Sequence, residues 1–314
     1  MDRWRGLVRR LRSGDRVAHA VTLVVASSVL LVTVLLVAEL YGSSALSRAK
    51  FGWSFLFTRT WDPIAAQFGS LAFVWGTVVT SLLALLIAVP IGVGAAIFLA
   101  ELAPPRISGA LTFVVELLAA VPSVIYGLLA VFTLVPVLRE QVEPFLQRRF
   151  GYLPLFQGPM YGVGVLAASL ILAIMILPFI VTISREALLA VPAEQREAAL
   201  AVGATRWEAA WHAVVPFARL GIVGSVFLAL ARALGETMAV TMVIGNTPRI
   251  SASLFAPGYS IAAVIANEFT EATSSMHVSA LIQLGLVLFA LTILLNGVAR
   301  LLIMATTGKG TAQG

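Results

Sequence analysis

An arginine and a glutamate stand four residues apart inside one long apolar stretch of the sequence. In the run Arg232-Ala233-Leu234-Gly235-Glu236 the two charges share one face of a helix. An arginine in the middle of a membrane span costs at least about 2.5–3.5 kcal/mol. The pair either neutralises itself or serves an ion pathway. Because Arg ahead of Glu is the weaker order for a helical ion pair, the pathway is favoured.

Two further side chains belong to the same candidate pathway. Thr237 follows Glu236 directly, and Glu116 stands in another apolar segment, where a position at the membrane edge is the alternative. We expect Arg232, Glu236, Thr237 and Glu116 to line a substrate pathway. At rest Glu236 is expected to neutralise Arg232, because a pore must bind its ion weakly enough to release it.

A charged, helix-prone loop between two apolar segments is the second candidate site. Residues 185–219 hold four acids, four arginines, two tryptophans and a closing Pro216. Alanines and one glycine give this loop a smooth, closely approachable surface. We expect short helices that dock on a soluble protein; the alternative is a loop folded against the membrane domain. The coupling residues would be Glu197, Ala198, Ala199, Gly203, Ala204, Arg206 and Pro216.

The composition excludes a soluble domain. Apolar residues make up 60% of the 314, charged residues 11%, and the mean hydropathy is +0.98. A helix that crosses a bilayer needs about 20 apolar residues. The uncharged segment 250–267 contains Pro257-Gly258 and is interpreted as an extracytoplasmic loop with a short re-entrant piece. The sequence predicts an all-α membrane protein with six spans, at 20–42, 71–100, 110–138, 160–183, 220–246 and 278–303.

Basic residues set the expected orientation. Six arginines between Arg3 and Arg16 precede the first apolar segment, which favours cytoplasmic N- and C-termini and places the loop 185–219 in the cytoplasm. The expected division is a basic tail 1–19, a first helix 20–42, a transport domain 71–303 and a tail 304–314. The sequence contains no phosphate-binding loop, no catalytic triad spacing and no cysteine, so we expect neither ATP hydrolysis nor a metal site in this chain.

Several of these segments resemble a known family. Glu197-Ala198-Ala199, Gly203 and Val215-Pro216 resemble the loop motif of ABC-importer permeases, with Ala213 and Val215 where Ile and Leu are usual. The stretch from Arg232 to Val240 is similar to the PstC branch of the phosphate-specific permeases. The sister branch, PstA, tends to read Gly-Glu-Thr-Ala-Pro there. The segment Ala120 to Gly127 resembles the same family.

The resemblance covers roughly residues 70–303 and implies a type I importer permease with a MetI-like core in the bacterial cytoplasmic membrane. It implies transport of inorganic phosphate. It also implies a heterodimer with a PstA-like permease subunit, two PstB-like ATPase subunits that bind ATP and Mg, and a PstS-like phosphate-binding protein. The alternatives are a permease for another oxyanion, such as sulfate or molybdate, and a stand-alone secondary anion transporter.

Overall fold

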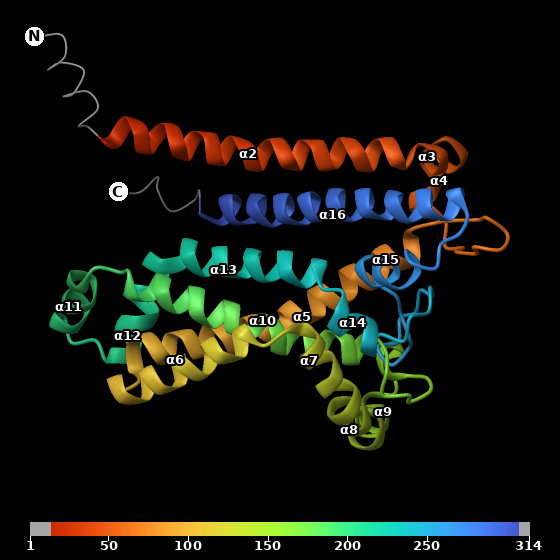
Figure 1. The fold of residues 1–314 in the computed structure, drawn as a ribbon. Helices are drawn as coiled ribbons and strands as arrows, with labels where there is room; N and C mark the ends of the chain where they lie inside the picture. Colours follow the sequence, from red (N-terminus) through yellow and green to blue (C-terminus); the bar gives the residue numbers. More distant parts are fainter. Residues whose placement is uncertain (1–13, 308–314) are drawn as a thin grey trace, which may run out of the picture.

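The computed structural model describes residues 14–307, and this part of the chain is built from helices (Figure 1). The arginines at 3, 5, 9, 10 and 12 and the tail from 308 lie outside the described residues. The helices are α2 (Gly14–Ser43), α3 (Ala45–Phe51), α4 (Ser54–Phe57), α5 (Leu71–Ile97), α6 (Pro105–Ala120), α7 (Ser123–Leu129), α8 (Val135–Val137), α9 (Glu143–Phe150), α10 (Val165–Leu189), α11 (Ala193–Ala201), α12 (Arg206–Ala209), α13 (Val215–Gly235), α14 (Met238–Val243), α15 (Ile261–Glu268) and α16 (Ser275–Thr307).

Within the described range, six helical stretches are long and apolar enough to cross a membrane. Their number agrees with the sequence prediction, but several boundaries differ. The segment 250–267 contributes only the eight-residue helix α15, which is too short to span. The six stretches are Ala18–Ser43, Leu71–Leu102, Ser123–Phe150, Val165–Leu189, Arg206–Gly235 and Ser275–Leu301.

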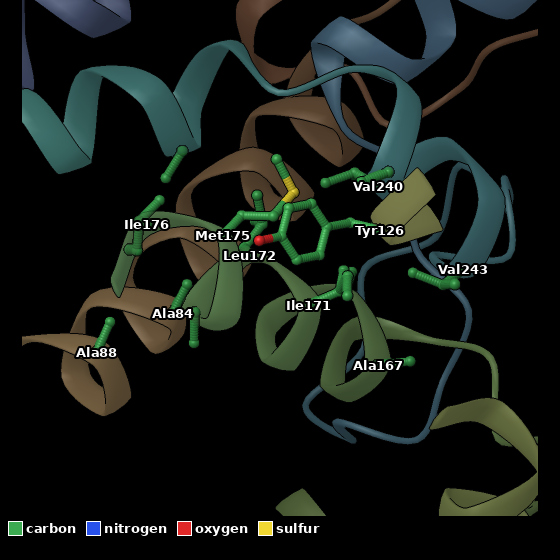
Figure 2. Close-up of a cluster of buried hydrophobic side chains, with 14 of the residues drawn as sticks. Ala84, Ala88, Tyr126, Ala167, Ile171, Leu172, Met175, Ile176, Val240 and Val243 are labelled. Atoms are coloured by element: carbon green, nitrogen blue, oxygen red, sulfur yellow. The ribbon is translucent and has the colours of Figure 1, made fainter. Parts of the chain in front are cut away.

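Helix α10 is the centre of the fold. Of its apolar window 67% is buried, whereas none of the window of α2 is, so α2 lies at the periphery beside α16 (Figure 1). The core around α10 gathers apolar side chains from α5, α7 and α14 (Figure 2). Its members include Ala84, Ala88, Tyr126, Ile171, Leu172, Met175, Ile176, Val240 and Val243.

Small residues let α5 and α10 approach each other closely. A Cβ placed on Gly92 would lie 2.8 Å from Cγ2 and 3.0 Å from Cβ of Ile180, which is closer than packed carbon atoms come. Gly94, two residues further along the same helix, has open space around it. The glycine at 92 therefore serves helix packing, as small residues commonly do in membranes.

The single span predicted over 110–138 is wrong, because the chain breaks at Val121-Pro122 between α6 and α7. Proline has no backbone N–H, so the carbonyl oxygen of Leu118 loses its helical donor four residues on. The hydroxyl of Tyr126 donates to that oxygen at 2.7 Å and replaces the missing bond. The third spanning stretch is consequently Ser123–Phe150.

The spans predicted at 160–183 and 220–246 are also displaced. The first begins at Val165, because Gly158, Gly162 and Gly164 hold the preceding loop with positive φ angles of 113°, 74° and 159°. The second ends at Gly235, where the backbone turns extended at Glu236 before α14 begins. The loop 185–219 is likewise shorter than predicted, since a continuous helical stretch already begins at Arg206. Pro216 does not close that loop. It lies in the first turn of α13, directly after a π-helical turn at Ala210–Val214.

The close contact at Gly92 generates a stability prediction. Gly92→Ala should lower the free energy of unfolding by about 1–3 kcal/mol, because the added methyl group pushes Ile180 on α10 away from α5. The matched change Gly94→Ala should be neutral or stabilising by up to ~1 kcal/mol, since alanine favours the helix and meets nothing there. Thermal unfolding of the two purified variants in detergent makes the comparison. Equal losses in both would contradict this account of the α5–α10 contact.

Candidate functional site

Arg232 lies on α13, within a candidate membrane span, and is partly exposed. Its guanidinium carbon lies 4.5 Å from the centre of the Phe179 ring on α10, a cation–π contact. Its Nε is buried without a hydrogen-bond partner. In the described part of the chain no carboxylate lies within ion-pair distance of this arginine. Its charge is therefore available to a group outside this chain.

The expected neutralisation of Arg232 by Glu236 is not observed, and that prediction is wrong for this conformation. The helix ends at Gly235, so the two side chains do not share a helical face. Glu236 is 9% exposed, and its Oε1 accepts a long hydrogen bond of 3.4 Å from the amide of Ala239 in α14. The carboxylate thus spans the break between α13 and α14.

The other two predicted pathway residues have different surroundings. Thr237 is the residue before α14 and lies beside Glu236 at the break. Its carbonyl oxygen accepts bonds from the amide and hydroxyl of Thr241. Glu116 is exposed on α6 and forms no ion pair with Arg232 among the described residues. Arg232, Glu236 and Thr237 are thus neighbours along the chain at the α13–α14 break, without a hydrogen bond or ion pair between Arg232 and the other two, and Glu116 lies on a different helix.

An exposed face runs along α13 toward the break. Gly224, Leu228, Ala231 and Gly235 recur at helical spacing and are all exposed. A Cβ on Gly235 would meet nothing within 4 Å, so close approach inside this chain does not require that glycine. A small-residue face beside an open arginine leaves room for another helix or an ion.

The coupling segment, residues 190–211 of the predicted loop, contains the short helices α11 and α12, as the sequence predicts. Helix α11 carries the predicted Glu197, Ala198 and Ala199, and the bonds of Gly203 N to Leu200 O and Ala204 N to Ala199 O close its end. Gly203 has a φ of +91° and open space around its Cα. The turn therefore needs glycine for its backbone conformation, not for close packing within this chain.

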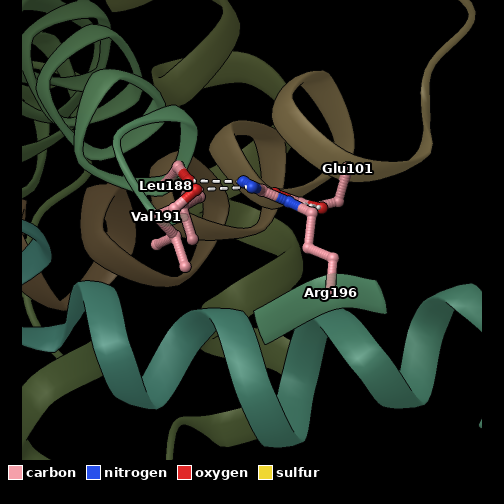
Figure 3. A network of polar contacts seen from close by, with 4 residues as sticks. All are labelled: Glu101, Leu188, Val191 and Arg196. Atoms are coloured by element: carbon pink, nitrogen blue, oxygen red, sulfur yellow. Dashed lines mark hydrogen bonds and ion pairs between the residues drawn. The ribbon is translucent and has the colours of Figure 1, made fainter. Parts of the chain in front are cut away.

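A partly buried ion pair holds α11 against the membrane helices (Figure 3). Arg196 binds Glu101 with three donor contacts of 2.8–3.1 Å, and the two side chains are 25% and 10% exposed. Its other N–H groups donate to the carbonyl oxygens of Leu188 at 2.7 Å and Val191 at 2.6 Å, at the end of α10. Hydrogen bonding to Glu101 raises the pKa of Arg196 above its ordinary value. One arginine thus joins the ends of α5, α10 and α11.

The coupling segment exposes large apolar side chains among charged ones such as Glu194, Glu197 and Glu208. Val202 is 86% exposed, and the rings of Trp207 and Trp211 stack at 5.9 Å with about half of each residue exposed. A capping box at the start of α12, in which Thr205 Oγ1 accepts from Glu208 N and Glu208 Oε2 accepts from Thr205 N, fixes the tryptophan helix. Arg206 is exposed beside Trp207.

Sequence reasoning missed the role of Glu101 and Arg196, because 95 residues separate them along the chain. It also missed the capping box, although the spacing Thr205-Arg206-Trp207-Glu208 carries that signal.

Comparisons with known proteins agree with this architecture. The family model described as binding-protein-dependent transport system inner membrane component matches residues 88–306. The chain is similar to the phosphate transport system permease protein PstC of Mesorhizobium japonicum, with 47% identity over 95% of this chain and 92% of that protein. The protein of the same name from Haemophilus influenzae is 46% identical over 89% of this chain and 92% of its own length. The one from Xylella fastidiosa strain 9a5c is 47% identical over 82% and 81%.

A solved structure shares the fold. The MetNI methionine ABC transporter in an inward-facing conformation superposes with a TM-score of 0.50, covering 72% of this chain and 93% of that chain, at 19% identity. This likeness concerns the fold alone and supports the predicted MetI-like arrangement.

The ion pair at Arg196 generates a second prediction. Arg196→Gln should destabilise the attachment of α11 by about 1.5–3 kcal/mol, since it removes charged hydrogen bonds and leaves Glu101 without its cation. Hydrogen exchange should accelerate at the amides of residues 193–201. The exposed pair Arg139–Glu140, with 55% and 63% exposure, provides the control change Arg139→Gln, which should leave exchange unaltered. Unchanged exchange in Arg196→Gln would show that other contacts hold α11.

Proposed function

This chain belongs to the family of binding-protein-dependent transport system inner membrane components, and from that premise we propose that it is a permease subunit of an ATP-driven importer of inorganic phosphate. It is a multi-pass protein of the inner membrane with six spanning helices among its described residues. The assignment of phosphate as the substrate rests on the names of relatives that are 46–47% identical over most of the chain.

The state of Arg232 is the structural observation that most supports an anion pathway. A buried guanidinium N–H without a partner costs about 1–3 kcal/mol or more for a charged group, and membrane surroundings increase that cost. An oxyanion that reaches the exposed side of the guanidinium would accept from the N–H groups there and supply the opposite charge. The planar N–H groups of arginine match the oxygens of a phosphate.

Glu236 would act beside Arg232, but not as the neutralising partner that the four-residue spacing indicates. Its carboxylate closes the turn between α13 and α14, so it fixes where Arg232 and Thr237 stand relative to each other. A carboxylate can also accept a hydrogen bond from the P–OH of a protonated phosphate, which fully ionised sulfate cannot donate. Glu236 and Thr237 are therefore proposed pathway residues beside Arg232. Glu116, exposed on α6, would approach the pathway only from a neighbouring subunit's side.

The coupling segment is the proposed docking site for a separate ATPase subunit. Val202 after α11 and Trp207 and Trp211 at the start of the stretch Arg206–Gly235 are exposed apolar residues, and Arg196 anchors this segment to the transport core. Such an anchor would be required to transmit a movement of the ATPase to α5 and α10. ATP and Mg would be bound by that partner, and this chain would bind no cofactor of its own.

The remaining proposed partners follow from the same function. A PstA-like sister permease would cover the small-residue face of α13, two PstB-like ATPase subunits would take the coupling segments, and a PstS-like protein would deliver phosphate on the other side. The N-terminus, the C-terminus and the coupling segment would then all be cytoplasmic.

The role of Arg232 can be tested by transport. Arg232→Gln should lower phosphate uptake by the assembled complex in proteoliposomes at least tenfold, because the site loses its charged hydrogen bonds to the anion. Arg232→Lys should retain part of the uptake, since an ammonium keeps the charge but not the planar donors. Arg249→Gln, an exposed arginine in the loop after α14, serves as the control. Uptake at the wild-type rate in Arg232→Gln would leave Arg232 a structural residue.

The docking surface has its own test. Val202→Asp places a charge on an exposed apolar position, so it should weaken copurification of the ATPase subunit at least tenfold without changing insertion or thermal stability. Ile64→Asp, at a position that is 99% exposed in the loop before α5, is the matched control. Gly203→Asp should also uncouple ATP hydrolysis from uptake, in part through strain at a φ of +91°. Full ATPase retention in Val202→Asp would refute docking at this surface.

A further inference from the structure

An apolar groove lies far from the candidate pathway, at the end of α2 that is distant from the N-terminus. It has a volume of about 910 Å³, near the upper end of the ~300–1,000 Å³ range of small-molecule sites. Its walls come from the last turns of α2, the α3–α4 region, the start of α5 and the middle of α16. Because α2 and α16 are both candidate membrane spans, the groove opens toward the lipid.

One charged residue, Arg48 on α3, lines this groove. Its guanidinium carbon lies 3.5 Å above the ring of Tyr41, its Nε donates to Ser44 Oγ at 3.1 Å, and one further nitrogen donates to the carbonyl oxygen of Tyr41. Among the described side chains no carboxylate lies within ion-pair distance of it. The arginine is thus held in place by neutral groups while its charge is left unbalanced.

A second polar group of the lining has no partner. Gln283 on α16 is 7% exposed, and its Oε1 is buried without a hydrogen bond. A buried amide oxygen in that state costs about 1–3 kcal/mol. Rotation of the amide by half a turn would present either its oxygen or its N–H₂ group to the groove. The groove therefore combines a long apolar wall with one cation and one open amide.

That combination fits an amphiphile better than a protein helix. Arg48 lies five residues beyond the span that ends at Ser43, at the depth where lipid phosphates meet the protein. Hydrogen bonds of Ser279 Oγ with Ser47 N at 3.1 Å and Ser43 O at 3.2 Å tie α2 and α3 to α16. A helix with its side chains is about 10–12 Å wide and cannot pass between walls joined in this way. An acyl chain is narrower and can lie between them.

We infer that this groove binds an anionic phospholipid, with an acyl chain along α2 and α16 and the phosphate on the guanidinium of Arg48. Arginine binds a phosphate with two parallel N–H donors, which gives geometric fit as well as charge. Gln283 would bond a polar group of the glycerol region, and the exposed Trp53 would lie at the headgroup level, where tryptophans gather. The lipid would lie in the leaflet opposite the N-terminus and would stabilise the packing of α2 against the rest of the fold.

Native mass spectrometry of the purified complex tests this site. The complex is delipidated and titrated with phosphatidylglycerol, phosphatidylcholine or inorganic phosphate. One phosphatidylglycerol should bind per chain, at least tenfold more tightly than phosphatidylcholine. Arg48→Gln should remove that preference, and Ala290→Trp, which fills the groove from an exposed position of its lining, should abolish retention of either lipid. Arg59→Gln, an exposed arginine outside the lining, should bind lipid as the unchanged complex does.

The other occupants give different results in the same experiment. Equal lipid retention by the unchanged complex, Arg48→Gln and Ala290→Trp would overturn the inference. Displacement of the lipid by millimolar inorganic phosphate would assign Arg48 to the free anion instead. Loss of the sister permease from Ala290→Trp, with lipid binding unaltered, would identify the groove as a protein interface. Phosphate uptake is not the readout, so these outcomes are separate from those for Arg232.

Discussion

Lipid offers the backbone no hydrogen-bond partners, so a break in a spanning helix leaves polar groups that need other partners. At three breaks a side chain supplies such a bond. The Tyr126 hydroxyl donates to the carbonyl oxygen of Leu118, four residues before Pro122, and Arg196 donates to the carbonyl oxygens of Leu188 in α10 and Val191 just beyond it. Glu236 accepts from the amide of Ala239 where α13 gives way to α14. Specific side chains therefore define where these helices stop.

Two arginines have contrasting surroundings in this structure. Arg196 uses most of its donors on Glu101 and on the carbonyl oxygens of Leu188 and Val191. Arg232 rests on the ring of Phe179 and keeps donors unused. Arg196 therefore joins parts of the fold to one another, whereas Arg232 keeps donors that another group could accept from.

Much of this architecture is accessible from the sequence, because long apolar runs and the coupling motif are local signals. The number of spans and the short helices of the coupling segment are confirmed. The ends of the spans are less accessible: the helix stops at Pro122 and Gly235 lie inside long apolar runs, and hydropathy does not reveal the side-chain hydrogen bonds beside them. The expected pair of Arg232 with Glu236 fails for that reason, since spacing assumes an unbroken helix. The contact between Glu101 and Arg196 has no local signal at all.

The peripheral position of α2 has a consequence for biosynthesis. The hydroxyl of Ser279 in α16 donates to the carbonyl oxygen of Ser43 at the end of α2, 236 residues earlier in the chain. At a synthesis rate of about 5–20 residues per second, α2 waits roughly 10–50 s in the membrane before this partner is made. The strongly apolar sequence of α2, whose most apolar window has a mean hydropathy of 2.7, makes that wait tolerable. The groove between the two helices is consequently completed only when α16 arrives.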